Sequence, residues 1–278
     1  SSDVCSSDLL VRMSGGEPRS LDPQKVDSTP DMNILQDVFE GLTRINTSGQ
    51  PELALASSYK VSKDGTTYNF QLKPNLRWSD GSPLTAYDCA FGITRMVDPK
   101  VGASNNALAE PILNSDLVTN GKLPLKQFGV QALNKENLEI KLKYPMPTLL
   151  DLLASVNFAC VNPKDFNEKG DLISEQKIHT NGAYFISNRR FGDHFELSKN
   201  PYYYDAKKVK INKVIFYTTE DIQTQKNMFL AHEVDITGPG SIPSNELNHL
   251  KSTIKGEVYT PPMLAVLFLH LNLQSDVF

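Results

Sequence analysis

The sequence predicts a mixed fold, α/β or α+β, of about two domains. The chain has 278 residues, roughly twice the length of a typical domain. Hydrophobic residues make up 40% of it and charged residues 22%, which is close to the average for globular proteins and argues against a disordered or fibrous chain. Helix-like and strand-like segments are mixed along the chain without a strict βα alternation.

The charge balance and the apolar runs exclude two classes of protein. The 28 Lys and Arg residues and the 32 Asp and Glu residues give a net charge of −4, whereas a nucleic-acid-binding surface needs an excess of basic residues. The longest apolar run, residues 263–271, is much shorter than the about 20 residues of a membrane-spanning helix. We therefore expect no nucleic acid partner and no such helix. A lipid anchor outside this sequence stays open.

Both ends of the chain are unusual. The first ten residues read SSDVCSSDLL and lack the basic start and apolar stretch of a signal peptide. Because they resemble translated adapter sequence, we interpret residues 1–11 as a non-native leader and leave them out of the expected fold. The other end stops at Phe278, directly after an apolar run and without a cap or turn. We therefore expect a fragment of a longer protein.

Two helices and a hairpin are predicted in the first hundred residues. Apolar residues at helical spacing and a proline at the start predict a helix over residues 30–42. A turn at residues 63–65 joins two alternating segments and predicts a β-hairpin. Thr85 as N-cap and Asp88 three positions later form a capping-box pattern. We expect a second helix from there to Asp98, which precedes a proline.

The second half of the chain holds most of the predicted strands. Residues 105–121 are less regular, and the polar residues 162–181 are interpreted as a crossing between domains. Pro147 opens a short helix, and Asp221 is expected to cap another that carries Ile222, Phe229 and Leu230. Alternating or apolar segments predict strands at 138–142, 183–187, 194–198, 214–218, 234–236 and 263–271. The last of these is nearly continuous in apolar residues, as in a strand that is buried on both faces.

No pattern of residues points to catalysis or to a metal. Cys5, Cys89 and Cys160 are an odd number of cysteines at wide spacing, so no disulfide framework is expected. Cys89 is interpreted as a small core residue, and a single Cys89–Cys160 bridge stays an open alternative. The five histidines show no metal-ligand spacing, and no nucleophile motif is present. We therefore expect a protein that is not an enzyme and needs no metal or cofactor.

Six short motifs occur in an order that is typical of one family. They are SLDP at 20–23, VFEGL at 38–42, WSDGSPLTAYD at 78–88, TNGAY at 180–184, NPYYY at 200–204 and EVDI at 233–236. The third matches the family pattern WSDGxPxTAxD. Through these motifs, which extend over nearly all of the chain, it resembles the extracytoplasmic solute-binding proteins of peptide ABC importers, family 5, and most closely their oligopeptide-binding group.

The resemblance implies an α/β, two-lobed, periplasmic-binding-protein-like (type II) fold. Because family members continue well beyond this length, the fold would be truncated before most of the second lobe. The first lobe would consist of residues 12–39 and 165–262, and a smaller domain would be inserted at 40–164. Residues 263–278 would form the first strand of the truncated second lobe.

The resemblance also implies a function. The chain is identified as the substrate-binding component of a peptide ABC import system, periplasmic or associated with the cell envelope. It would capture extended oligopeptides between two lobes by pairing with their backbone and deliver them to the membrane permease subunits, as a monomer when full length. Two alternatives stay open. One is the same fold binding a non-peptide solute such as a nickel chelate, haem or an opine, and the other is a ligand-sensing module coupled to a signalling partner.

Two segments of the first lobe and the inserted domain are implied to contact ligand. Asp27 and Thr29 align with the segment that pairs with peptide, where Asp27 stands at an acidic position that faces a ligand side chain. The alternative is an ordinary solvated loop acid. Asn105 and Asn106 fall near the loop where many relatives place a contacting tyrosine, so an aromatic contact is not expected there. The alternative is a plain polar loop.

Four more ligand contacts are implied on a strand beside the hinge. They are Ala265, Leu267, Phe268 and His270. Phe268 keeps one of the aromatic residues of the family, whereas His270 stands where the oligopeptide binders have an acid. This exchange would lower the negative charge of the cleft and its preference for basic side chains. The alternative is that the whole run is a core strand.

Overall fold

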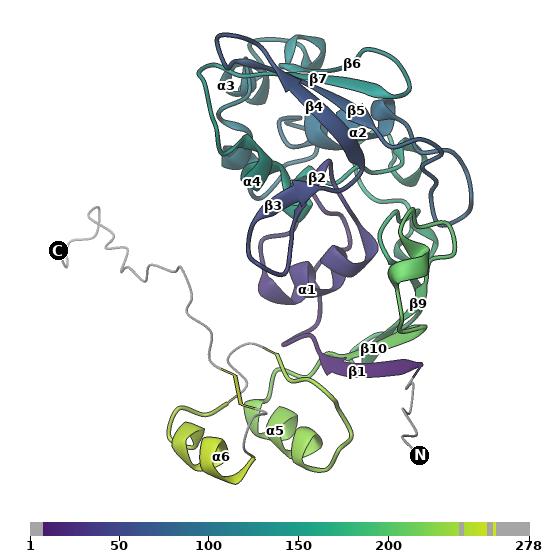
Figure 1. Cartoon of the computed structure of the whole chain (residues 1–278), viewed down its shortest axis with the longest axis vertical. Coiled ribbons are helices and arrows are strands. Elements are labelled where there is room, and N and C mark those ends of the chain that lie inside the picture. The colour runs from purple at the N-terminus through teal and green to yellow at the C-terminus, as the bar shows by residue number, and fades with distance from the viewer. Residues whose placement is uncertain (1–7, 239–241, 255–257, 260–278) are drawn as a thin grey trace, which may run out of the picture. The chain divides into compact units, whose positions relative to one another are not determined.

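The structure is a computed structural model that describes residues 8–238, 242–254 and 258–259 (Figure 1). It consists of two compact units, residues 1–241 and residues 242–278. Among the described residues, all strands belong to the first unit, and the second contains the short helix α6 (Leu247–Thr253).

One four-stranded sheet joins the two ends of the first unit. Its order is β1-β10-β9-β8. β1 (Leu9–Met13) runs parallel to β10 (Lys213–Tyr217), and the other two pairings are antiparallel. β9 (His194–Lys199) and β8 (Tyr184–Arg190) form a hairpin. The three strands predicted between residues 183 and 218 are thereby confirmed.

The expectation that the leader lies outside the fold is wrong for its last residues. Residues 9–11 form the first part of β1 and pair with β10 from Lys213 onward. The main-chain oxygen of Asp8 also accepts the N–H groups of Asn212 (3.1 Å) and Lys213 (2.9 Å). Backbone groups pair whatever their side chains are, so an unusual sequence can still extend a strand wherever its neighbour offers partners.

The strand predicted at residues 234–236 is reduced to an isolated bridge between Ile236 and Arg12. The carboxylate of Asp235 accepts the N–H of Val11 at 2.7 Å. In a longer β-ladder, the Val11 N–H would donate to a main-chain oxygen of the neighbouring strand. Because it donates to the Asp235 side chain instead, the pairing stops after one bridge.

Helix α1 (Thr29–Val38) ends four residues earlier than the predicted helix. The carbonyl of Val38 accepts the N–H groups of Asn181 (3.1 Å) and Gly182 (2.9 Å), and the Asn181 side chain accepts the N–H of Glu40 (2.9 Å). These bonds satisfy the end of the helix and turn the chain away from the helical path. Their partners lie 141 to 144 positions apart, so no local pattern could reveal them.

A second sheet of four antiparallel strands is built from the middle of the chain. Its order is β4-β5-β7-β6. The strands are β4 (Ala56–Val61), β5 (Thr67–Leu72), β6 (Val130–Ala132) and β7 (Asn137–Lys141). The hairpin predicted around residues 63–65 is confirmed as β4 and β5. Two short strands, β2 (Thr43–Ile45) and β3 (Pro51–Leu53), form a separate pair.

Helix α2 (Ala86–Arg95) packs against β6 and β7 of this sheet. It begins at the predicted capping box, in which the Asp88 carboxylate accepts the N–H of Thr85 at 2.7 Å. The other helices are α3 (Ser115–Thr119), α4 (Leu149–Leu153) and α5 (Ile222–Leu230). Asp221 caps α5 as predicted, and α3 lies in the stretch that we expected to be less regular.

Two hydrophobic cores support the two sheets. One contains Phe70, Trp78 and Ile93, and the other contains Leu35 and Phe195. Neighbouring residues of the segment 156–161 contribute to different cores. The domain boundaries given above stay a prediction.

Cys89 of α2 and Cys160 form a disulfide. Cys89 lies in the hydrophobic core as predicted, and the bridge to Cys160, which the sequence left open as an alternative, is present. One helical turn further on, Gly92 faces the same segment. A Cβ atom at Gly92 would lie 2.3 Å from the main-chain oxygen of Ala159. The missing side chain lets the helix backbone approach this segment closely enough for the bridge to form.

We expect Gly92→Ala to lower the free energy of unfolding by about 1–3 kcal/mol, because the added methyl group overlaps a backbone oxygen that cannot move aside. The direction of the change is informative. In an ordinary helix, glycine to alanine raises the stability by about 1 kcal/mol, so a loss of stability points to the close contact. Urea unfolding followed by circular dichroism measures the change. The control is Tyr87→Ala on the same helix, at a side chain that is 54% exposed. An increase in stability for Gly92→Ala would contradict the close contact.

Candidate functional site

Asp27 and Thr29 lie on the surface where the chain enters α1. Both residues are exposed. Between them, Ser28 is the N-cap of the helix, and its hydroxyl donates to the Asp31 carboxylate at 2.7 Å. Among the residues that the structure describes, none forms a hydrogen bond or an ion pair with the Asp27 carboxylate, so this charge faces solvent.

The structure brings the two predicted ligand-contact segments together. The Asn105 side chain donates to the main-chain oxygen of Val26 at 3.1 Å, and the Ser104 hydroxyl donates to that of Lys25 at 2.8 Å. Asn106 follows as an exposed residue at the start of a 3-10 turn. Asn105 is therefore partly occupied in holding the neighbouring loop, whereas Asn106 presents its side chain to solvent.

The loop that carries Asp27 rests on a buried asparagine that no prediction included. We call residues 22–29 the ligand loop. Asn157 is fully buried, and its side-chain nitrogen donates to the main-chain oxygens of Pro23 (2.8 Å) and Val26 (3.0 Å). The sequence contains one signal for it, an asparagine inside an otherwise apolar run. Buried polar groups need partners, but the partners could not be named in advance.

A buried ion pair fixes the start of the ligand loop. Arg95, the last residue of α2, contacts the Asp22 carboxylate, and its Nε donates to the Gln24 side chain at 3.0 Å. Asp22 is 1% exposed and Arg95 3%. Burial raises the pKa of the Asp22 carboxyl and lowers the pKa of the Arg95 guanidinium, and the attraction between the two opposes both shifts. Since buried charges persist only when they are paired, the pair fastens the loop to α2.

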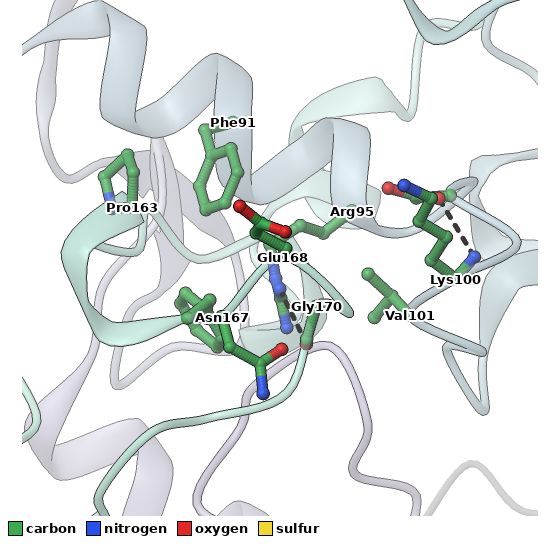
Figure 2. Close-up of a pocket in the computed structure, with 10 residues that line it drawn as sticks. Phe91, Arg95, Lys100, Val101, Pro163, Asn167, Glu168 and Gly170 are labelled. Atoms are coloured by element: carbon green, nitrogen blue, oxygen red, sulfur yellow. Dashed lines mark hydrogen bonds between the residues drawn. The ribbon is translucent and has the colours of Figure 1, made fainter.

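Arg95 also lines a cavity of about 290 Å³ (Figure 2). Its guanidinium carbon lies 3.6 Å from the centre of the Phe166 ring, and Nη1 donates to the main-chain oxygen of Gly170 at 3.1 Å. Phe91, Val101 and Pro163 add apolar walls. Because each guanidinium nitrogen of Arg95 already donates to a protein oxygen, we interpret the cavity as a by-product of this packing and assign no ligand to it.

The remaining predicted contacts, Ala265, Leu267, Phe268 and His270, lie outside the described residues. Within the described ranges, no group of three or more His, Cys, Asp or Glu side chains is placed to hold a metal ion. No described helix combines the length and the apolar content that crossing a membrane requires.

Residues 50–278 match the family described as "Bacterial extracellular solute-binding proteins, family 5 Middle". The periplasmic oligopeptide-binding protein OppA of Salmonella typhimurium is 33% identical over 273 residues, which cover 97% of this chain and 50% of the relative. The periplasmic murein peptide-binding protein MppA of Escherichia coli is 34% identical over 275 residues, 96% of this chain and 49% of the relative. YgiS of E. coli, a probable deoxycholate-binding periplasmic protein, is 31% identical over 265 residues, which cover 94% of this chain and 49% of the relative. The chain spans about half the length of these curated relatives.

Solved structures agree with the sequence comparison. The unliganded open form of MppA superposes with a TM-score of 0.86 at 33% identity and covers 92% of this chain and 50% of that one. Haemophilus influenzae OppA, in complex with the peptide RPPGFSPFR, also gives a TM-score of 0.86, at 27% identity, with 90% and 49% covered. These likenesses confirm the predicted α/β fold of the two-lobed, periplasmic-binding-protein-like class.

Proposed function

The chain belongs to family 5 of the bacterial extracellular solute-binding proteins, and from this premise we propose that it is part of the substrate-binding component of a peptide ABC import system. The observation that carries the proposal is its likeness, over more than nine tenths of its length, to proteins named for binding oligopeptides and murein peptide. The complete protein would capture extended oligopeptides between two lobes and deliver them to the membrane permease subunits of the transporter.

The proposed architecture follows the boundaries given by the resemblance. Residues 12–39 and 165–262 would form the first lobe, residues 40–164 the inserted domain, and residues 263–278 the start of the second lobe. Support comes from the two separate hydrophobic cores and from the first sheet, in which β1 pairs with β10, 204 positions later in the chain.

The proposed ligand contacts divide by mechanism. Thr29 and the strand that carries Ala265 and Leu267 would pair with the peptide backbone, which is the same in every peptide. Asp27, Asn106, Phe268 and His270 would face peptide side chains, with Asn105 supporting both the loop and the ligand. Waters between polar groups and ligand would replace lost contacts at little cost, which suits a carrier of mixed peptides.

We place the protein outside the cytoplasm, in the periplasm or at the cell envelope. Its curated relatives OppA and MppA are named as periplasmic proteins. The Cys89–Cys160 disulfide supports the same location, because disulfides persist mainly in oxidising compartments. We further propose that it acts as a monomer, binds no nucleic acid, requires no metal or cofactor and releases its ligand chemically unchanged.

A second candidate is the same fold carrying a non-peptide solute. The likeness to YgiS, which is named for binding deoxycholate, supports it, and a nickel chelate, haem or an opine would belong to this class too. Mass spectrometry of the ligand that copurifies with the complete protein separates the two. A peptide mixture would support the first candidate, and a single non-peptide solute the second.

Asp27→Lys is expected to weaken the binding of a lysine-bearing peptide up to about 30-fold, equivalent to about 2 kcal/mol, while a neutral peptide of the same length changes less than about twofold. An attraction of about 1 kcal/mol between two solvated charges becomes a repulsion, whereas backbone pairing stays intact. Calorimetry with the complete protein at low ionic strength measures both constants. The matched control is Thr29→Ala, which keeps every main-chain group. Equal losses for the two peptides would mean that peptide does not lie beside Asp27.

A further inference from the structure

We infer that Asn157 is a positioning residue for ligand. It holds the ligand loop in the shape that presents Asp27 and Thr29, and it does so without touching ligand itself. The inference rests on the proposed function in that it takes the ligand loop as part of the binding site.

The Asn157 side chain uses its full hydrogen-bonding capacity. Its nitrogen donates to Pro23 and Val26 of the ligand loop. Its oxygen accepts from the Asn105 side chain at 3.4 Å and from the Ser155 hydroxyl at 3.1 Å. An amide offers two donor hydrogens and two acceptor sites. One fully buried side chain therefore joins the ligand loop to the segment of Asn105.

A second connection is made by a side chain of the ligand loop itself. The Gln24 side chain, itself buried, donates to the main-chain oxygens of Asn157 (3.2 Å) and Ala159 (3.4 Å). Its side-chain oxygen accepts a hydrogen bond from the Nε of Arg95. The loop is thus bonded to the segment 157–159 by its own side chain and by the side chain of Asn157. A change in either side chain removes one of these two connections.

The position of the exposed Asp27 depends on the buried contacts of Asn157 and Gln24. Val26, whose oxygen is bonded to Asn157 and to Asn105, directly precedes Asp27. Among the described residues, no partner bonds to the Asp27 side chain, and nothing but the backbone fixes its direction. A loop that is already in its bound shape loses less freedom when ligand arrives. If only a fraction of the molecules has that shape, the apparent affinity falls by that fraction.

This role has a kinetic signature that a loss of overall stability does not share. When the loop samples other shapes, fewer encounters succeed, so the association rate falls for every peptide. Once bound, the contacts are those of the original protein, and the dissociation rate stays the same. We expect Asn157→Ala to reduce the association rate constant about tenfold for a neutral and for a lysine-bearing peptide alike, with dissociation unchanged within about twofold.

The matched control is Asn200→Ala. Asn200 is also fully buried, and its amide donates to the main-chain oxygen of Gly182 (3.0 Å) and accepts the N–H of Tyr202 (3.0 Å). It therefore reports the cost of losing a buried amide away from the ligand loop. Asn200→Ala should lower the melting temperature and leave the association rate unchanged. If Asn157→Ala does not fold, Asn157→Ser, which also removes the amide but leaves a polar group in the buried position, takes its place, and the same results are expected.

Stopped-flow fluorescence with a labelled peptide and the complete protein measures the rates. Hydrogen exchange in the ligand-free protein is the second readout, at the amides of Gln24 and Lys25, which donate to Asp22. Faster exchange there in Asn157→Ala, but not in Asn200→Ala, is expected even if the true ligand is not a peptide. If the original protein binds no peptide, the proposed function fails while the exchange result still decides the inference. Unchanged exchange at both amides, or equal association rates in both variants, would overturn it.

Discussion

Arg95→Met is expected to lower the free energy of unfolding by about 3–5 kcal/mol, because it leaves the Asp22 carboxylate buried without its partner. Both side chains are almost completely excluded from water. The variant also removes the donor to Gln24 and the stacking contact with Phe166. Urea unfolding, with the slope of the transition checked against the original protein, measures the loss.

The double variant Arg95→Met/Asp22→Asn distinguishes the loss of the ion pair from the cost of a buried, unpaired Asp22 carboxylate. In the original protein, the Gln24 N–H donates to the Asp22 carboxylate at 3.1 Å. Asparagine at position 22 can still accept this bond but carries no charge. We expect the double variant to recover most of the stability lost in Arg95→Met. The control is Lys208→Met, which removes an ion pair with Asp205 at 2.9 Å from a side chain that is 78% exposed. Such a pair contributes about 0–1 kcal/mol. A loss as small as this for Arg95→Met would contradict the buried pair.

Removal of the Cys89–Cys160 bridge is the second large effect. The bridge closes a loop across a sequence separation of 71 residues, and the chain-entropy argument assigns about 4 kcal/mol to a loop of that length. We expect Cys89→Ala/Cys160→Ala to lose up to this amount. Thermal and urea unfolding, with and without a reducing agent, measure it.

Each single variant should behave like the double one, since either change breaks the same bond. A reducing agent should destabilise the original protein and leave the double variant unaffected. Cys5→Ala serves as the control for the removal of a cysteine that lies outside the described residues. Titration with a thiol reagent before and after reduction counts the bonded cysteines. Both cysteines are fully buried, so the titration is made in urea. If Cys89 and Cys160 both react there without reduction, the bridge is absent and this prediction is wrong.

Local patterns predicted a large part of the secondary structure. The turn at residues 63–65 gave the β4–β5 hairpin, the Thr85 and Asp88 pair gave the start of α2, and Asp221 gave the start of α5. In each case, the residues that form the signal lie within a few positions of the element they control. Hairpin turns and helix caps are made by neighbours in the chain, so they are visible without knowledge of the fold.

The candidate site could be predicted only in part. The resemblance pointed to Asp27 and Asn105, and the structure brings the ligand loop and the Asn105 segment together. It could not point to Asn157, because an asparagine in an apolar run looks the same whether it caps a turn or holds a loop from another part of the chain. The contacts proposed between residues 265 and 270 stay predictions.

The sequence by itself determined the family, the class of fold, most of the strands and helix starts, and the region where ligand is proposed to bind. The tertiary structure alone decided four features. They are the early end of α1, the entry of residues 9–11 into the sheet, the Cys89–Cys160 bridge, and the Asn157 and Arg95 contacts beneath the ligand loop. Each depends on partners that lie 71 or more positions apart. Packing brings such partners together, and the residues around each one carry no trace of the other.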